Sequence, residues 1–216
     1  MQERLTALLA LALFGLGVLL SVSHGGAGAG DQARISFQIA TGPSGGTLFT
    51  VGQAIAGLVS HPPGVGRCDT STVCGPSGVI LSARTSQGAS DSLNAVNNGL
   101  VDSALVQAGM VDAAVTGSRP FRRPLRHIRV IAALFSDPAA QGSAGADRRV
   151  IWVVNEKASD ALVYGLVRAL FNPANHAALA DSNPAAGGID ISSAAQSPPA
   201  PLHSGAARYY REAGKL

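Results

Sequence analysis

Charged residues are scarce in this chain of 216 residues, and aromatic and cysteine residues are few. Aspartate, glutamate, lysine and arginine together make up only 13% of the sequence, and the mean hydropathy is positive at +0.23. Intrinsic disorder requires high charge and low hydrophobicity, so this composition excludes a largely disordered chain. The length allows a sizeable core, in one ordinary domain or two small ones.

Metal and nucleotide sites lack their characteristic residues. The two cysteines, Cys68 and Cys74, have no second Cys/His pair nearby, as a zinc site would need. The five histidines are dispersed and show no paired His/Glu spacing, so we predict no catalytic metal. The turn GPSGG has no lysine where a P-loop requires one, which would leave the phosphates of a nucleotide without a counter-charge. We therefore predict no metal and no cofactor.

The first thirty residues predict export. Arg4 precedes an apolar run over residues 5–20, and an Ala-Gly-Ala motif ending at Ala29 supplies the small residues that a signal peptidase reads. We predict a signal peptide over residues 1–29, with cleavage after Ala29, and a periplasmic mature protein. The alternative is an uncleaved membrane anchor, since residues 5–22 are just long enough to span a bilayer.

Export would place the two cysteines in an oxidising compartment. Cys68 and Cys74 lie six residues apart in GRCDTSTVCG, with a glycine near each. In an oxidising compartment this spacing predicts a local disulfide. The loop is small, so we expect a stabilisation of about 2 kcal/mol, at the low end of the usual range.

Short hydrophobic strands alternate with helices along the rest of the chain. We predict strands over residues 35–40, 79–83, 103–107, 128–134 and 150–154. We predict helices over residues 48–59, from Ser90 or Asp91 to Asn98, and over residues 110–115, 158–171, 172–180 and 206–211. This alternation is typical of an α/β fold with a doubly wound, mainly parallel sheet.

Polar turns follow three of the predicted strands, at residues 41–47, 85–87 and 107–109. In parallel sheets, ligands bind outside the carboxyl ends of the strands. The first turn offers the hydroxyls of Thr41, Ser44 and Thr47, and three glycines that let backbone N–H groups approach a ligand. These N–H groups would lie at the positive end of a helix dipole, where carboxylates and phosphates are stabilised. The pattern predicts a site for a small anion.

Two of the polar segments also suggest other functions. The turn GPSGG matches the nucleophile elbow of serine hydrolases, with Ser44 as nucleophile and His176 or His203 as base. Too little of the mature chain precedes Ser44 to form the earlier strand that supplies the oxyanion loop, so we predict no enzyme. The arginines of residues 119–129 could contact nucleic acid, but export separates them from it, and a solvated loop is the simpler interpretation.

Five segments of the chain, taken in order, carry a resemblance to a known family. They are IATGPSGGTLFTVGQAIA, TSQGASDSLNAVNNGLVDSALVQAGMV, LRHIRVIAALFSD, ASDALVYGLVRALF and PLHSGAARYYREAGKL. They resemble the TAXI-type solute-binding proteins of TRAP transporters. The resemblance implies a periplasmic-binding-protein-like fold of type II. It also implies capture of a small organic anion, such as a dicarboxylate or an acidic amino acid, and transfer of that anion to a TRAP-type membrane permease.

The resemblance also indicates which residues face the ligand. Carried onto this chain, they are Thr41, Gly42, Ser44, Gly45, Gly46 and Thr47 from the first turn, Ser86 and Gln87 from the second, and Gln107 after the third strand.

The chain departs from this family in one respect. Family members have two lobes that close on the ligand, whereas only residues 135–149 separate the fourth strand from VIWVV. We therefore expect residues 30–216 to form a single lobe, built from residues 30–137 and 150–216, with a loop over residues 138–149 in place of the second lobe. Two alternatives stay open: a homodimer that completes the cleft, and a degenerate interaction or sensor module that no longer binds solute.

Overall fold

Five hydrophobic segments form one sheet in the computed structural model, which describes residues 34–69, 72–137 and 147–216. The strands are β1 (Ile35–Gly42), β2 (Val79–Thr85), β3 (Ser103–Gln107), β4 (Ile128–Ser136) and β5 (Arg149–Asn155). Their order in the sheet is β2-β1-β3-β5-β4, and β1 pairs in parallel with both β2 and β3. β5 runs antiparallel to its neighbours β3 and β4. The α/β prediction is confirmed, and the sheet is mixed around a parallel core.

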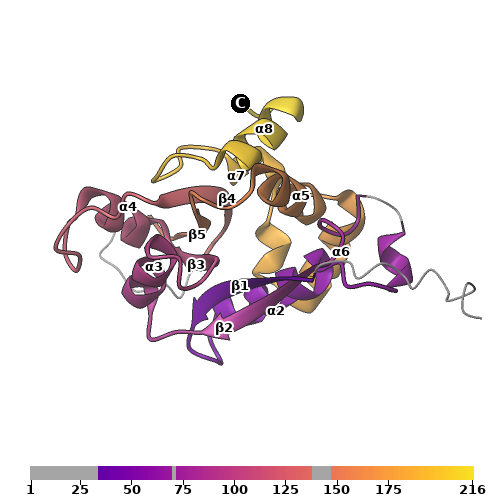
Figure 1. Ribbon diagram of the computed structural model, residues 1–216, viewed down its shortest axis with the longest axis horizontal. Helices are drawn as coiled ribbons and strands as arrows, with labels where there is room; N and C mark the ends of the chain where they lie inside the picture. The colour runs from indigo at the N-terminus through magenta and orange to yellow at the C-terminus, as the bar shows by residue number, and fades with distance from the viewer. Residues whose placement is uncertain (1–33, 70–71, 138–146) are drawn as a thin grey trace, which may run out of the picture. The chain divides into compact units, whose positions relative to one another are not determined.

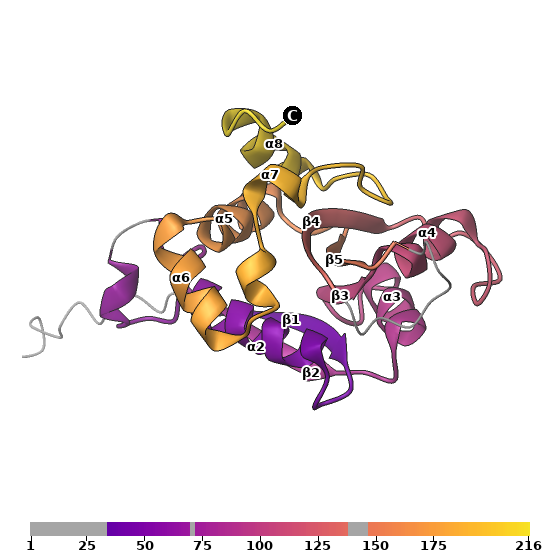
Figure 2. The same ribbon diagram turned by 180° about the vertical axis from the view of Figure 1, so that it is seen from behind.

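Helices cover both faces of this sheet (Figures 1 and 2). They are α2 (Thr47–Val59), α3 (Ala89–Asn97), α4 (Ala108–Thr116), α5 (Asp160–Leu170), α6 (Pro173–Ser182), α7 (Ile191–Ala194) and α8 (Ser204–Glu212). α2 and α5 contribute to one hydrophobic core, and α6 packs against α2. α3 and α4 contribute to a second core on the opposite face. Helices on both faces make the sheet doubly wound, as predicted.

The two cores follow from alternation of side chains along the strands. In β5, Val150, Trp152 and Val154 belong to the first core, whereas Ile151 and Val153 belong to the second. All five side chains are fully buried. Strands buried on both faces read as continuous hydrophobic runs, which is why VIWVV is so apolar.

One edge of the sheet is covered by the C-terminal part of the chain. The backbone N–H of Val130 in β4 donates to the carbonyl of Pro201, and the N–H of His203 donates to the carbonyl of Val130, both at 2.9 Å. The hydroxyl of Tyr210 in α8 donates to the carbonyl of Ile131 at 2.9 Å. These bonds fix α8 beside β4.

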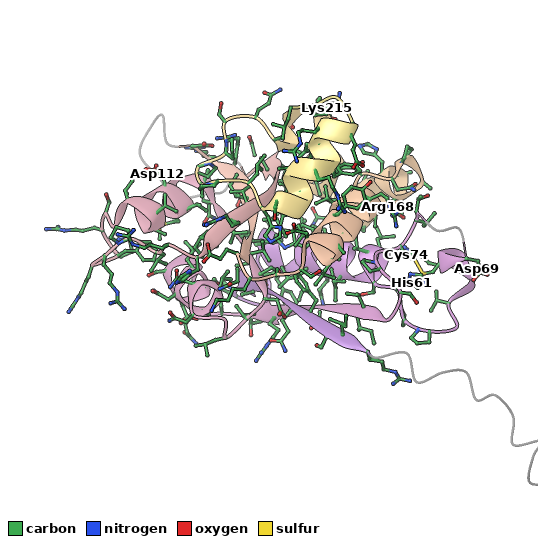
Figure 3. The ribbon with its side chains drawn as sticks, turned by 45° about the horizontal axis from the view of Figure 1, so that its top comes forward. His61, Asp69, Cys74, Asp112, Arg168 and Lys215 are labelled. Atoms are coloured by element: carbon green, nitrogen blue, oxygen red, sulfur yellow. A yellow bond between two sulfur atoms is a disulfide. The ribbon has the colours of Figure 1, made fainter. Side chains whose placement is uncertain are left out.

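Cys68 and Cys74 form the predicted disulfide, with their Cα atoms 5.3 Å apart. Figure 3 shows Cys74 close to His61 and Asp69. The segment around the disulfide is tied to α6, because the side-chain amide of Asn175 donates to the carbonyl of Val73 at 2.6 Å. The disulfide therefore belongs to a segment that is bonded to the main body.

The local structure departs from the predictions in three places. β5 runs antiparallel to its neighbours, in a sheet that was predicted to be mainly parallel. α3 begins after Gly88, which provides no side-chain cap, rather than at Ser90 or Asp91. The sequence also did not indicate α7 or the 3₁₀ turns Gly66–Cys68 and Ala186–Gly188, which are too short to show a hydrophobic period. The predicted signal peptide and most of the predicted loop at residues 138–149 lie outside the described residues.

Candidate functional site

The carboxyl ends of β1, β2 and β3 lie side by side at one end of the sheet, because these three strands are adjacent and parallel. We call this end of the strands the carboxyl edge, and the opposite end the amino-terminal edge. Each is followed by a helix: α2 after β1, α3 after β2 and α4 after β3. α2 packs on one face of the sheet, and α3 and α4 pack on the other. The point where neighbouring strands send their helices to opposite faces is where open α/β sheets bind ligands. Here β1 differs in this way from both of its neighbours, β2 and β3.

The three helices that begin at this edge have no side-chain caps. Their N-cap residues are Gly46, Gly88 and Gln107, and none of these has a side chain that accepts a hydrogen bond at the helix start. By contrast, side chains cap α6, α7 and α8. Ser159 also leaves α5 uncapped, but α5 follows the reversed strand β5 and so begins at the other edge. Three helix starts with free N–H groups at one edge favour an anion there.

Two glycines at these helix starts have no structural reason to be glycine. A Cβ atom built on Gly45 or on Gly109 would meet no atom within 4 Å, and neither residue has a positive φ angle. Gly42 is different, because its φ of +93° disfavours any other residue. The space beside Gly45 and Gly109 leaves the backbone at the starts of α2 and α4 open to close approach by a ligand.

The first two predicted turns are bonded to each other. The hydroxyl of Thr41 donates to the carbonyl of Arg84 at 3.0 Å, and the N–H of Ser86 donates to the carbonyl of Gly42 at 3.1 Å. Thr41 is only 2% exposed, so in this conformation its hydroxyl is buried and stabilises the turn instead of facing solvent. The hydroxyl of Ser86 is also engaged, at 2.7 Å from the hydroxyl of Ser92.

The other predicted residues lie more openly. Ser44 and Gln87 are exposed, and Thr47, at the first position of α2, is partly exposed. Gln107 is partly exposed at the end of β3, where its backbone pairs with Val150 of β5. Within the described ranges, no side-chain hydrogen bond joins Gln107 to the first two turns. The edge therefore combines exposed polar side chains with the uncapped helix starts.

The structure does not assemble a hydrolase site around Ser44. His203 is 1% exposed, and its ring is engaged on both sides: Nδ1 accepts from the N–H of Gly205, and Nε2 lies 3.1 Å from the carbonyl of Ala158. His176 lies in α6, beside a cavity that Ile189 and Asp190 also line. Neither histidine forms a hydrogen bond with Ser44 in the part of the chain that the structure describes.

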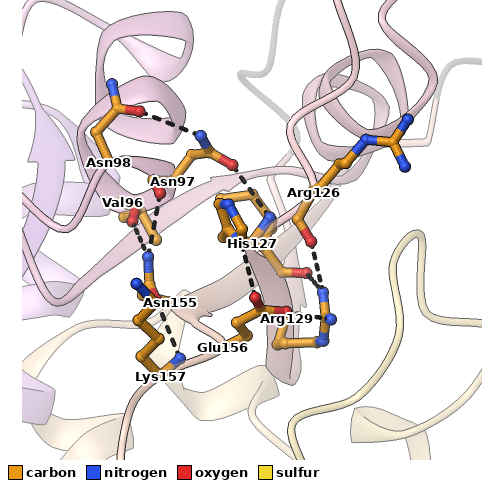
Figure 4. Close-up of polar contacts among 10 residues, drawn as sticks. Val96, Asn97, Asn98, Arg126, His127, Arg129, Asn155, Glu156 and Lys157 are labelled. Carbon is orange, nitrogen blue, oxygen red and sulfur yellow. Dashed lines mark hydrogen bonds and ion pairs between the residues drawn. The ribbon is translucent and has the colours of Figure 1, made fainter.

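Sequence reasoning missed a polar network at the opposite, amino-terminal edge of the parallel strands (Figure 4). The Nδ1 atom of His127 lies 2.6 Å from Oε1 of Glu156, and Arg129 pairs with the other carboxylate oxygen. The hydrogen bond with His127, helped by the charge of Arg129, lowers the pKa of Glu156. The side chain of Asn155 donates to the carbonyls of Val96 and Asn97, at 2.7 and 3.2 Å.

This network borders a cavity of about 270 Å³. The cavity mixes apolar and polar side chains of both charges, and its lining residues are Phe37, Asn97, Asn98, Gly99, Asp102, His127, Asn155, Lys157, Ala158 and Leu162. No motif signalled it, because the residues come from four separate segments that only the fold brings together. It contains none of the predicted ligand-facing residues.

Among residues 34–69, 72–137 and 147–216, no three metal-ligating side chains gather in one place. Over the same ranges, no helix combines the length and hydrophobicity needed to cross a bilayer.

Comparison with known families finds a match over most of the chain. The model of the NMT1-like family matches residues 39–144 and 148–214, which is most of the chain and includes all three polar turns. No curated protein matches the sequence significantly.

Proposed function

Because the chain belongs to the NMT1-like family, a family of periplasmic solute-binding proteins, we propose that it binds a small organic anion at the carboxyl edge of β1, β2 and β3. The proposed ligand is a dicarboxylate or an acidic amino acid. The proposed contacts are Ser44, Thr47, Ser86, Gln87 and Gln107, together with the backbone of Gly42, Gly45 and Gly46. Thr41 holds the edge in place through its bond to Arg84.

The observation that carries this proposal is the convergence of three uncapped helix starts after three adjacent parallel strands. Each start presents backbone N–H groups and a partial positive charge of about half an elementary charge. Neither α2 nor α4 has an acidic residue in its first turn, and α3 has only Asp91. A carboxylate at this edge would gain hydrogen bonds that the protein itself does not supply.

The proposed partner is a membrane transporter, since solute-binding proteins pass their ligand to one. The resemblance of the turns and of the C-terminal segment PLHSGAARYYREAGKL to TAXI-type receptors favours a TRAP-type permease. Export would depend on residues 1–29, through a cleaved signal peptide or, alternatively, an uncleaved anchor. N-terminal sequencing of the exported protein distinguishes these two routes.

We further propose that residues 30–216 act as a single lobe. β4 and β5 pair with each other as far as Ser136 and Arg149, so only residues 137–148 connect the two strands. A single lobe leaves its binding edge open on one side, whereas tight capture of a small molecule requires burial of most of its surface. A second copy of the chain that covers this edge would complete the cleft.

Calorimetric titration of the protein with succinate, malate, aspartate and glutamate tests the proposed function. We expect at least one of them to bind with a sub-millimolar dissociation constant and to raise the midpoint of thermal unfolding, because a ligand that binds only the folded state stabilises it. Sedimentation in the presence of that ligand shows whether the binding species is a monomer or a dimer.

The direct pairing of Ser136 with Arg149 also favours a second candidate function, an interaction or sensor module that has kept one lobe and lost the solute. If none of these anions binds better than millimolar, in either the monomer or the dimer, the second candidate is supported.

A further inference from the structure

The arginine-rich segment between α4 and β4 is anchored to the protein. Phe121 and Leu125 are each 7% exposed and belong to the second core. The N–H of Leu125 donates to the carbonyl of Ala114 at 2.8 Å. Gly117, with a φ of +77°, lies so close to Pro124 that a Cβ atom there would be 2.7 Å from the proline ring. These contacts hold the backbone that carries the arginines in a defined position.

A cavity of about 270 Å³ lies between this segment and the C-terminal end of α3. We call it the amide–arginine pocket. Its lining combines three asparagines, two arginines and three apolar residues: Asn94, Asn97, Asn98, Pro120, Phe121, Arg122, Arg123 and Leu125. None of the described residues that line it carries a carboxylate. It shares Asn97 and Asn98 with the neighbouring cavity at the amino-terminal edge, where Asp102 is present.

Hydrogen bonds already fix two of the three amides in this pocket. The side chain of Asn94 donates to the carbonyl of Ser90 at 2.8 Å. The side chain of Asn97 accepts from the N–H of His127 at 3.1 Å and donates to the side-chain oxygen of Asn98 at 3.2 Å. This leaves the amide N–H groups of Asn98 as donors for a ligand. The asparagine side chains of the pocket are therefore held in place before a ligand binds.

The two arginines of the pocket have no acidic partner in the described part of the chain. Among residues 34–69, 72–137 and 147–216, neither Arg122 nor Arg123 takes part in an ion pair or a side-chain hydrogen bond. They are not needed to cap α3 either, because the side chain of Asn155 already donates to the carbonyls of Val96 and Asn97 at the end of that helix. Two exposed arginines and the amide of Asn98 thus line a pocket that has no carboxylate among its described lining residues.

We propose that the amide–arginine pocket binds the phosphate group of a small molecule. Guanidinium groups bind phosphate oxygens through paired N–H donors, and two of them match the charge of a phosphate monoester, which is about −1.5 to −2 at pH 7. The pocket lies at the amino-terminal edge of the parallel strands, whereas the proposed solute site lies at the carboxyl edge. Phosphate therefore binds independently of the transported anion.

Calorimetric titration of the full chain with inorganic phosphate tests this proposal. Arg122 and Arg123 are replaced together by glutamine, and the matched control replaces Arg119 and Arg126, which lie in the same segment but do not line the pocket. We expect wild-type protein to bind phosphate in the low-millimolar range or tighter. The Arg122→Gln/Arg123→Gln variant should lose about tenfold or more in affinity, as expected for the loss of charge-assisted hydrogen bonds. The Arg119→Gln/Arg126→Gln variant should lose less than about twofold in affinity for phosphate, because salt screens the interaction of exposed, distant charges with the ligand.

Three results would overturn the proposal: no binding of phosphate to the wild type, equal weakening in the two double variants, or binding of phosphatidylglycerol vesicles without binding of free phosphate. A Gly45→Asp variant, which alters the proposed solute site, should bind phosphate like the wild type. Loss of phosphate binding in that variant would show that phosphate occupies the solute site, and would also count against a second site.

Discussion

The hydroxyl of Thr41 donates a 3.0 Å hydrogen bond to the backbone carbonyl of Arg84, and this bond joins the ends of β1 and β2. Next to it, the N–H of Ser86 donates to the carbonyl of Gly42. Two turns that are more than forty residues apart in sequence therefore hold each other in position. The proposed solute site depends on this pairing, because its ligand-facing groups come from both turns.

Replacing Thr41 by valine should remove this bond without changing the size of the side chain. We expect the free energy of unfolding to fall by about 1 kcal/mol, the usual net contribution of such a hydrogen bond. Thr41→Ser keeps the hydroxyl and serves as the control for the bond. Urea unfolding followed by the fluorescence of Trp152, the single tryptophan, measures both variants. Equal stability of Thr41→Val and wild type would show that the bond contributes nothing.

Gly52 of α2 packs against the side chain of Thr41. A Cβ atom on Gly52 would be 2.7 Å from the methyl carbon of Thr41, whereas a Cβ atom on Gly57 in the same helix would meet nothing within 4 Å. We expect Gly52→Ala to lower the free energy of unfolding by about 1–3 kcal/mol through overpacking. Gly57→Ala should raise it by about 0.5–1 kcal/mol, because alanine favours the helix. If both variants change stability in the same direction, the inference that α2 packs closely on Thr41 at Gly52 would be wrong.

The disulfide between Cys68 and Cys74 closes a loop of small sequence separation. Its reduction should lower the free energy of unfolding by about 2 kcal/mol, mainly because the unfolded chain gains freedom. Thermal unfolding with and without dithiothreitol measures the change. A Cys68→Ser/Cys74→Ser variant should not respond to dithiothreitol, and a response in that variant would assign the effect to something other than this bond.

His203 makes stability depend on pH. Burial lowers the pKa of His203 and outweighs the attraction of Asp160, whose carboxylate lies 3.9 Å from Nδ1. The unfolded chain therefore binds a proton more readily than the folded one below about pH 6.5, the ordinary value for histidine. We expect the contribution of His203 to the free energy of unfolding to be constant above that pH. It should fall as the pH decreases towards the pKa of His203 in the folded state.

A His203→Asn variant tests this expectation. Asparagine can still accept the hydrogen bond that His203 accepts from Gly205 at the start of α8, but it does not titrate. Urea unfolding between pH 5 and pH 8 should show a smaller loss of stability at low pH in the variant than in wild type. An unchanged pH dependence would mean that another group is responsible.

The fold was largely predictable from local pattern. Residues 103–107 were predicted as a strand and form β3, and β1, β2 and β4 extend each predicted run by two residues. The direction of β5 was not predictable, because a strand buried on both faces has the same hydrophobic run whether its neighbours are parallel or antiparallel. The start of α3 was missed because Gly88, with a φ of +137°, turns the chain before the better capping residues.

The candidate site could be predicted only in part. The three polar turns were visible because each follows a strand, and the parallel pairing of β1 with β2 and β3 brings them to one edge. The burial of Thr41 against Gly52 depends on how α2 packs, which periodicity does not specify. The network of His127, Glu156 and Asn155 was missed because its members come from two segments about thirty residues apart, neither with a recognisable motif.

A single negative charge at the start of α2 tests the central claim, that the carboxyl edge of β1, β2 and β3 binds an anion. Gly45→Asp places a carboxylate at this edge, and Gly57→Asp places the same charge near the other end of the same helix, with no steric conflict at either position. Calorimetric titration of both variants with succinate and with glutamate is the measurement. We predict that Gly45→Asp weakens binding of the anion that the wild type binds by about tenfold or more, as expected for like charges in contact, whereas Gly57→Asp binds like the wild type. Undiminished binding by Gly45→Asp would contradict the account.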